Sequence, residues 1–138
     1  MRDHAPVMLT AEEVAAQHPA PPVTESKIAR LRVLAEDANP KIRESVAASY
    51  HAPEDIFEKL ARDSDEGVRS WIARNENVSC DILRSLADDE SAKVRGWLAL
   101  NFFVPDDVMA RLAEDPDDTV RALVRWKASL ASEQLADA

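Results

Sequence analysis

The sequence Leu60-Ala-Arg-Asp-Ser-Asp-Glu-Gly-Val-Arg69 decides the fold of this 138-residue chain, because its pattern returns at a fixed interval. The stretch Leu86-Ala-Asp-Asp-Glu-Ser-Ala-Lys-Val-Arg95 begins 26 residues later. Both contain Leu-Ala-x-Asp and, five residues after the aspartate, an aliphatic residue followed by arginine. The same motifs stand in register on either side, at 34–43 and 112–121. Four copies at one period predict a repeat architecture.

Each repeat has the features of two short helices. The first begins near Pro53, Ser79 and Pro105 and carries acidic residues in its first turn, which suit the positive end of a helix dipole. The second opens at an N-cap residue whose side-chain oxygen can accept from a first-turn amide. Its apolar residues follow at i and i+4, on one helical face. The N-cap positions are Asn39, Asp65, Ser91 and Asp117, and the apolar pairs are Ile42/Val46, Val68/Ile72, Val94/Leu98 and Val120/Val124.

The apolar face of one repeat is too small to form a core alone. In the first helix it comprises only Ile56, Phe57, Leu60 and Ala61, or their equivalents 26 residues on. Stacked neighbours would share one continuous core, which is the principle of a solenoid. The chain contains only two glycines, which fits helices with tight turns better than a sheet. We therefore predict an all-α solenoid of about four 26-residue, two-helix repeats.

Two segments of the chain are predicted. Residues 1–24 form an N-terminal tail, in which Thr10–Glu13 has the spacing of a capping box that starts a short helix. The tail ends in a stiff, proline-rich linker at 18–22. Residues 25–138 form the repeat domain.

The ends of the helices and of the repeat domain carry further signals. Asn75 and Asn101 stand where a residue in the left-handed conformation would end a second helix. Residues 26–37 supply only a first helix and are expected to cap the stack. Residues 132–135 fall in register with a final, shortened first helix.

Composition and charge exclude several functions. Apolar residues make up 46% and charged residues 31%, as in ordinary globular proteins. The net charge of −9 argues against nucleic acid or an anionic membrane as the main partner. Cys80 is the only cysteine, and the three histidines are scattered, so we expect no metal and no cofactor. No stretch is long enough to span a membrane, and no signal peptide is recognisable, so a cytoplasmic protein is expected.

The repeated aspartates and arginines are interpreted as structural. A catalytic site is unique, whereas these residues recur in every repeat, so no enzymatic activity is expected. The arginines are predicted to bridge the aspartates and helix-end carbonyls of neighbouring repeats in a ladder, and the alternative is an anion-binding stripe. The two sets are Asp37, Asp63, Asp89 and Asp115, and Arg43, Arg69, Arg95 and Arg121.

Departures from the repeat are more informative about function. One set of equivalent positions reads Ser45, Trp71, Trp97 and Leu123, and another reads Ala48, Arg74, Leu100 and Trp126. The tryptophans either pack between second helices or floor a binding groove, because tryptophan is enriched in binding hot spots. The turns carry the further aromatic pairs Tyr50-His51 and Phe102-Phe103. The candidate binding residues are Trp71, Trp97, Trp126, Arg69, Arg74 and Arg95.

The repeat resembles the variant leucine-rich repeat family, a relative in architecture of HEAT repeats. The resemblance covers residues 26 to about 136 and rests on Leu-Ala-x-Asp, Val-Arg-x-x-(Val/Ile/Leu)-Ala, asparagine and a Pro-led helix ending in Leu-Ala. It implies a curved, right-handed superhelix of paired short helices, one of them partly 3₁₀. Members with an N-terminal cysteine cluster bind iron–sulfur there. This chain lacks those cysteines, and the family has no common activity.

Three functions are open at this point. The leading prediction is a non-enzymatic scaffold that binds a protein or peptide on its concave surface. An alternative is similarity to HEAT-like alkylpurine DNA glycosylases, because Trp71, Trp97, Arg74 and Asp63 are residue types found in such grooves, although the acidic charge disfavours nucleic acid. A third is a subunit of a larger assembly, such as a homodimer that pairs through exposed solenoid ends near Leu130 and Leu135.

Overall fold

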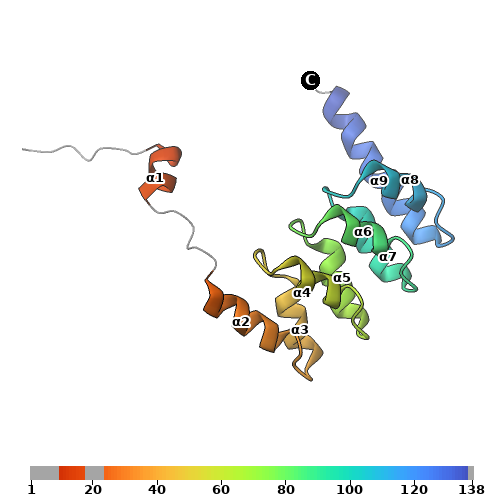
Figure 1. The fold of residues 1–138 in the computed structure, drawn as a ribbon. Helices are drawn as coiled ribbons and strands as arrows, with labels where there is room; N and C mark the ends of the chain where they lie inside the picture. Colours follow the sequence, from red (N-terminus) through yellow and green to blue (C-terminus); the bar gives the residue numbers. More distant parts are fainter. Residues whose placement is uncertain (1–9, 18–23, 137–138) are drawn as a thin grey trace, which may run out of the picture.

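The computed structural model describes residues 10–17 and 24–136, and this part of the chain is all-helical, as the repeat pattern predicts. Both helices of each pair are α-helices, so the partly 3₁₀ helix that the family resemblance implies is not present in the described ranges. The helices are α1 (Ala11–Gln17), α2 (Glu25–Leu34), α3 (Pro40–Ala47), α4 (Glu54–Leu60), α5 (Glu66–Arg74), α6 (Cys80–Leu86), α7 (Ala92–Leu100), α8 (Asp106–Leu112) and α9 (Asp118–Ala136) (Figure 1).

Helix α1 begins at the predicted capping box. The Thr10 hydroxyl accepts a hydrogen bond from the Glu13 amide at 3.1 Å, and the Glu13 carboxylate accepts one from the Thr10 amide at 2.8 Å. The bond from the Thr10 amide is the main reason why the pKa of Glu13 is lowered. The predicted linker at 18–22 lies outside the described residues, so the boundary between tail and repeat domain stays a prediction.

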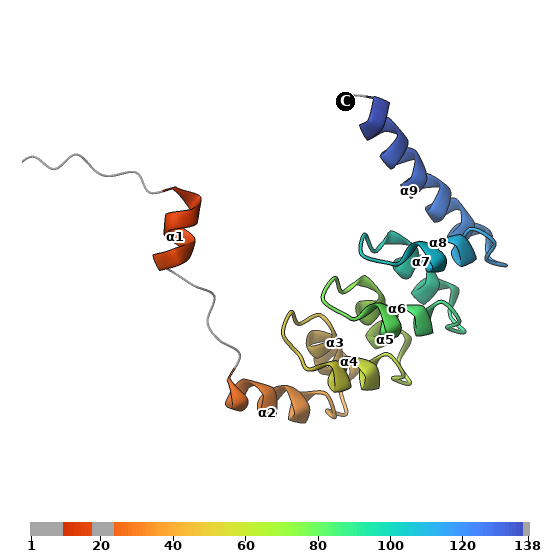
Figure 2. The same cartoon turned by 45° about the horizontal axis from the view of Figure 1, so that its top comes forward.

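The other helices form two rows. Helices α3, α5, α7 and α9, here called the odd row, pack each against the next. Helices α2, α4, α6 and α8 form the even row, in which α4, α6 and α8 each pack on the two odd-row helices adjacent in sequence. Successive pairs follow one another along an arc (Figure 2).

The predicted N-caps of the odd row are confirmed. Asp65 accepts a hydrogen bond from the Val68 amide at 3.1 Å, and Ser91 accepts one from the Val94 amide at 3.4 Å. Asn39 and Asp117 do the same at the starts of α3 and α9. Each cap satisfies first-turn amides that have no partner inside the helix.

The prediction of left-handed residues at Asn75 and Asn101 is wrong. Both are extended, with φ/ψ of −74°/123° and −73°/122°. Each helix ends here, where the asparagine side chain hydrogen-bonds both the preceding repeat and the turn that follows. The Asn75 amide group donates to the carbonyls of Ala47 and Ser49 in the preceding repeat, both at 2.8 Å, and its oxygen accepts from the Asn77 amide. Asn101 makes the equivalent bonds, so this pair of residues ties the odd row together.

The prediction of a separate helix at 132–135 is also wrong, because α9 continues without a break for 19 residues to Ala136. Lys127 stands 26 residues after Asn101 and has no side-chain oxygen that could accept a turn amide. Its ammonium group instead donates to the Asn101 carbonyl, so the tie between repeats is kept while the helix goes on. Burial in this position lowers the pKa of Lys127.

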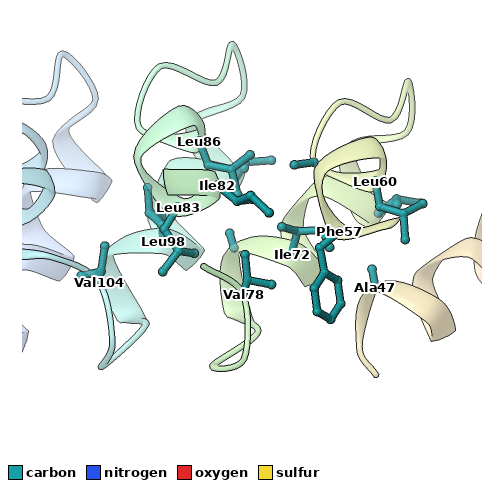
Figure 3. Close-up of a cluster of buried hydrophobic side chains, with 14 of the residues drawn as sticks. Ala47, Phe57, Leu60, Ile72, Val78, Ile82, Leu83, Leu86, Leu98 and Val104 are labelled. Atoms are coloured by element: carbon teal, nitrogen blue, oxygen red, sulfur yellow. The ribbon is translucent and has the colours of Figure 1, made fainter. Parts of the chain in front are cut away.

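The core runs between the two rows, as Figure 3 shows for its middle part. The predicted apolar positions of the central repeats are buried, including Leu60, Ile72 and Leu98, which are fully enclosed. At the ends of the stack the equivalent residues Ile42 and Val124 are only half-buried, because they have a neighbouring repeat on one side only. The continuous core thus depends on stacking, as the small apolar face of each repeat predicts.

The joints of the even row differ in their ion pairs. Two ion pairs connect α2 and its following turn to α4, and two connect α6 and its following turn to α8. Within 10–17 and 24–136 no ion pair joins α4 to α6, where Glu58 and Asp81 border the same surface hollow. The four pairs are Arg32–Asp55, Lys59–Glu36, Arg84–Asp107 and Arg111–Asp88.

None of the described helices has both the length and the apolar composition that crossing a bilayer requires.

Candidate functional site

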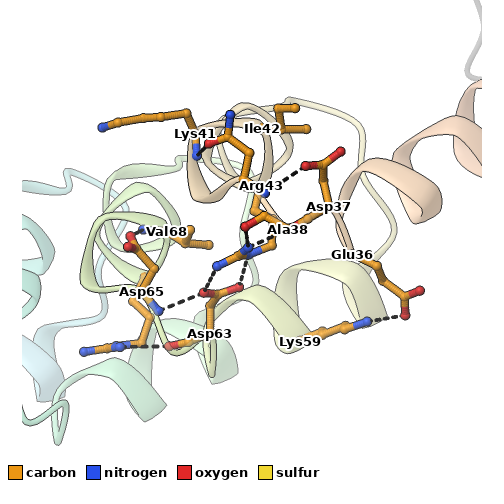
Figure 4. Close-up of polar contacts among 12 residues, drawn as sticks. Glu36, Asp37, Ala38, Lys41, Ile42, Arg43, Lys59, Asp63, Asp65 and Val68 are labelled. Atoms are coloured by element: carbon orange, nitrogen blue, oxygen red, sulfur yellow. Dashed lines mark hydrogen bonds and ion pairs between the residues drawn. The ribbon is translucent and has the colours of Figure 1, made fainter.

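The arginine ladder predicted from the repeat is present. Arg69 donates to the Asp89 carboxylate through Nε at 2.9 Å and Nη2 at 3.3 Å, and to the Asp63 carbonyl through Nη1 at 2.8 Å. The Asp89 carboxylate also accepts the Ser91 amide at 2.9 Å. Asp89 therefore orders the start of its own second helix and receives the arginine of the preceding repeat. Arg43 with Asp63 (Figure 4), and Arg95 with Asp115, make equivalent contacts.

The ladder is partly shielded from water. The side chains of Arg69 and Asp89 are 9% and 7% exposed. The hydrogen bond to Asp89 raises the pKa of Arg69. Burial alone would raise the pKa of Asp115, but hydrogen bonds from Arg95 and the Asp117 amide, with the charges of Arg95 and Arg121, leave it lowered.

These contacts separate the predicted binding residues into two groups. The guanidinium groups of Arg69 and Arg95 are engaged in the ladder and are not brought to the tryptophans. Asp63, the acid of the glycosylase-like alternative, is likewise engaged by Arg43 and by the Asp65 amide. Trp71, Trp97 and Arg74 form the second group, and the structure brings them together.

Trp71 on α5 and Trp97 on α7 lie at the edge of the core. Both side chains are partly buried and pack against core residues, and neither is enclosed. The two readings of these tryptophans, packing and binding surface, are therefore compatible. One side of each indole supports the odd row, while the remainder is available at the surface.

Arg74 links the two tryptophans. Its guanidinium carbon lies over the Trp71 ring at 4.2 Å from the centroid and over the Trp97 ring at 4.1 Å. Arg74 is in the last turn of α5, three residues after Trp71, and the packing of α7 on α5 brings Trp97 to the same group. A guanidinium over an indole face is attracted by the ring quadrupole, by about 0.5–1 kcal/mol at an exposed site.

The side-chain N–H groups of Arg74 bond no protein atom in the part of the chain that the structure describes. The side chain is exposed, and among the described residues it makes no hydrogen bond and no ion pair. Arg74 thus differs from the ladder arginines, each of which bonds both a carboxylate and a carbonyl.

A surface hollow adjoins Arg74. Its volume is about 240 Å³, and Tyr50, Trp71 and Arg74 are among its lining residues, with Ala48, Asn75 and Glu76. Tyr50 comes from the turn after α3 and is 71% exposed. Glu76 is the one acid in the lining, and it makes no ion pair with Arg74. The hollow therefore offers aromatic surface beside an unpaired cation.

Two further aromatic side chains of the repeat region are strongly exposed. Phe102 occupies the turn position equivalent to Tyr50 and is 70% exposed, and Trp126 on α9 is 52% exposed. Trp126 is in the same set of equivalent positions as Arg74, but no contact joins the two. We call Tyr50, Trp71, Arg74, Trp97, Phe102 and Trp126 the tryptophan face.

Tyr50 and Phe102 were not among the binding candidates predicted from the sequence. The available signal was their place in equivalent turns of different repeats. The sequence does not show that the turn after α3 reaches the hollow beside Trp71, because this depends on how α3 packs on α5. Within the described ranges no group of three or more His, Cys, Asp or Glu side chains is placed to hold a metal ion.

Comparisons of the chain with models of protein families, with curated proteins and with solved structures found no match. The geometry of the tryptophan face is therefore the basis of the functional assignment.

Proposed function

We propose that this chain is a non-enzymatic repeat protein that binds a protein or peptide segment on the tryptophan face. We further propose that it belongs to the right-handed α-solenoid class, as a relative of variant leucine-rich and HEAT-like repeats. The recurrence of one ladder and one asparagine tie at successive 26-residue steps supports this class. A cytoplasmic setting fits a chain whose only cysteine, Cys80, is an exposed free thiol.

The observation that carries the proposal is the Arg74 guanidinium held over Trp71 and Trp97 beside exposed aromatic side chains. Trp, Tyr and Arg are the residues most enriched in binding hot spots. Large aromatics that are 52–71% exposed leave apolar surface in water, where it is available to a partner. Two indoles and one arginine that are already ordered lose little conformational entropy when a partner binds.

The repeated carboxylates support a non-enzymatic role. Asp63, Asp89 and Asp115 are paired with arginines and amides, and Asp37 with an amide, so these carboxylates serve the fold. A role on damaged DNA has no specific observation in its favour, because Asp63 is engaged in the ladder and the chain carries a charge of −9. Pairing of copies through the ends of the stack stays a prediction, which sedimentation at high protein concentration would test.

Selection of short random peptides displayed on phage tests peptide binding. We expect wild-type protein to enrich peptides that bind it in solution, measured by fluorescence anisotropy. The double variant Trp71→Ala/Trp97→Ala should lose most of this affinity while circular dichroism shows that it stays helical. Val33→Ala, which removes apolar surface from a residue that is 72% exposed on α2, is the matched control and should bind like wild type.

Because the tryptophans also support the odd row, a second variant keeps the test decisive. Tyr50→Ala/Phe102→Ala changes only exposed side chains and should lower affinity without unfolding the protein. Failure of wild type to enrich any peptide, or undiminished, wild-type affinity in both double variants, would overturn the proposed function.

A further inference from the structure

Arg74 has the features of a receptor for an anion. Its five N–H donors have no acceptor within 10–17 and 24–136, although the side chain is held by two ring contacts. The equivalent positions in the other repeats are Ala48, Leu100 and Trp126, so an arginine here is not required by the repeat structure. Every ladder arginine, by contrast, is bonded to a carbonyl and a carboxylate. What sets Arg74 apart from other exposed arginines is that two indoles hold its guanidinium group in place, with its donors facing solvent and ready to bind acceptors of a ligand.

The chemistry around Arg74 restricts that ligand. The hollow beside it has Tyr50 and Trp71 in its lining, so aromatic surface adjoins the guanidinium group. A carboxylate can take two parallel hydrogen bonds from one guanidinium, which matches the single positive charge available here. A phosphate group carries nearly two negative charges and is usually bound by several cations. The nearby ladder arginines are already paired, and Glu76 in the lining repels a doubly charged phosphate more than a singly charged carboxylate.

We propose that Arg74 binds the carboxylate of an aspartate or glutamate in the partner peptide. This inference rests on the proposed function and names the recognition element of that surface. Apolar side chains next to the acid in the partner contact the exposed ring of Tyr50 and the accessible parts of the two indoles. The occupant is therefore an acidic residue in an otherwise apolar segment of another protein, not a uniformly acidic tail.

The experiment compares displayed peptide libraries that differ at one fixed central residue, Glu, Gln or Lys, against wild type and a set of variants. On wild type we expect the Glu library to be recovered about tenfold more than the Gln library, a ratio typical of one charge-assisted, bidentate contact. Arg74→Gln should bring this ratio to about one, since a neutral amide no longer favours the charged acceptor. Arg74→Glu should shift recovery to the Lys library. Arg30→Gln, which removes the same charge from an exposed position on α2, should behave like wild type.

The outcomes separate this inference from the function on which it rests. Peptides that bind wild type and depend on the tryptophans, but show no preference for Glu over Gln, would overturn the carboxylate assignment and leave the binding function standing. No selected peptide at all would overturn both. A selected peptide whose Glu is replaced by phosphoserine and then binds more tightly would overturn the choice of carboxylate over phosphate. Arg74→Lys keeps the charge without the planar fork, so a partial loss of preference is expected.

Discussion

Arg69 and Arg74 lie five residues apart on α5 and have opposite surroundings. Arg69 is 9% exposed and bonds the Asp89 carboxylate and the Asp63 carbonyl. Arg74 is exposed, rests against two indoles and has no bonded acceptor among the described residues. The repeat explains Arg69, which has equivalents in all four copies, and does not explain Arg74.

This difference shows how repetition separates structural from functional candidates. A side chain that recurs at one position makes the same contacts between neighbouring repeats, and its donors and acceptors are engaged in those contacts. A side chain that departs from the repeat is free of that requirement. The following predictions test the contrast, beginning with the largest expected effect.

Arg69→Ala should be the most damaging of these substitutions, lowering the free energy of unfolding by about 3 kcal/mol, because it leaves the shielded Asp89 carboxylate without its guanidinium. Urea unfolding followed by circular dichroism measures the change. Arg74→Ala, on the same helix, is the matched comparison. Equal losses for both variants would contradict the division between the two arginines.

Asn101→Ala should cost about 2 kcal/mol, since the buried carbonyls of Ala73 and Asn75 lose their donor. The same urea experiment measures this loss. Asn77→Ala, in an exposed turn, is the control and should change stability little. A cost for Asn101→Ala no larger than the control's would mean that the asparagine tie contributes nothing to the odd row.

Acid should weaken the ladder through Asp115. Its folded pKa lies below that of the unfolded chain, about 3.9, so its contribution is fully present above that pH and is lost as pH falls through the folded value. Asp115→Asn should therefore be less stable than wild type at pH 7 and lose less stability on acidification. Urea midpoints measured from neutral to acidic pH check this, with exposed Asp106→Asn as control. Parallel pH profiles for wild type and Asp115→Asn would exclude the linkage.

Arg74→Ala should have the smallest effect on stability, about 1 kcal/mol, because it removes only two exposed cation–π contacts. Its effect should instead be visible in tryptophan fluorescence, since the environment of Trp71 and Trp97 changes. Arg30→Ala on α2 should leave the emission spectrum unchanged. A loss of stability as large as that of Arg69→Ala would make Arg74 a structural residue.

Much of the fold was predictable because the same residue types recur at equivalent positions in each repeat. The N-caps, the ladder and the helix pairs follow from residues at equivalent positions. The left-handed conformation predicted for Asn75 and Asn101 is wrong. An asparagine that ends a helix can be left-handed or can be extended and hydrogen-bond a neighbouring repeat, and which of the two occurs depends on the carbonyls that the preceding repeat presents. The continuation of α9 depends on Lys127, whose bond to the Asn101 carbonyl is long-range.

The candidate site was predictable in its residue types and not in its geometry. Trp71, Trp97 and Arg74 stand out as departures from the repeat. Arg74 contacts Trp97 of the next repeat only because of the position at which α7 packs along α5. No local sequence pattern encodes that position. The same limit explains why Arg69 and Arg95 were grouped with Arg74, although their guanidinium groups belong to the ladder.

The unequal joints of the even row should respond differently to salt. Ion pairs join α2 to α4 and α6 to α8, whereas α4 and α6 meet without one and place Glu58 and Asp81 at the same hollow. Added salt, which screens exposed charges, should therefore weaken the α2–α4 and α6–α8 contacts and leave the α4–α6 contact unchanged. Trp71 and Trp97 stand on α5 and α7, the helices that follow α4 and α6 in the chain. A ligand that contacts both indoles therefore bridges, on the odd-row side, the same two repeats whose even-row helices share no ion pair within the described residues.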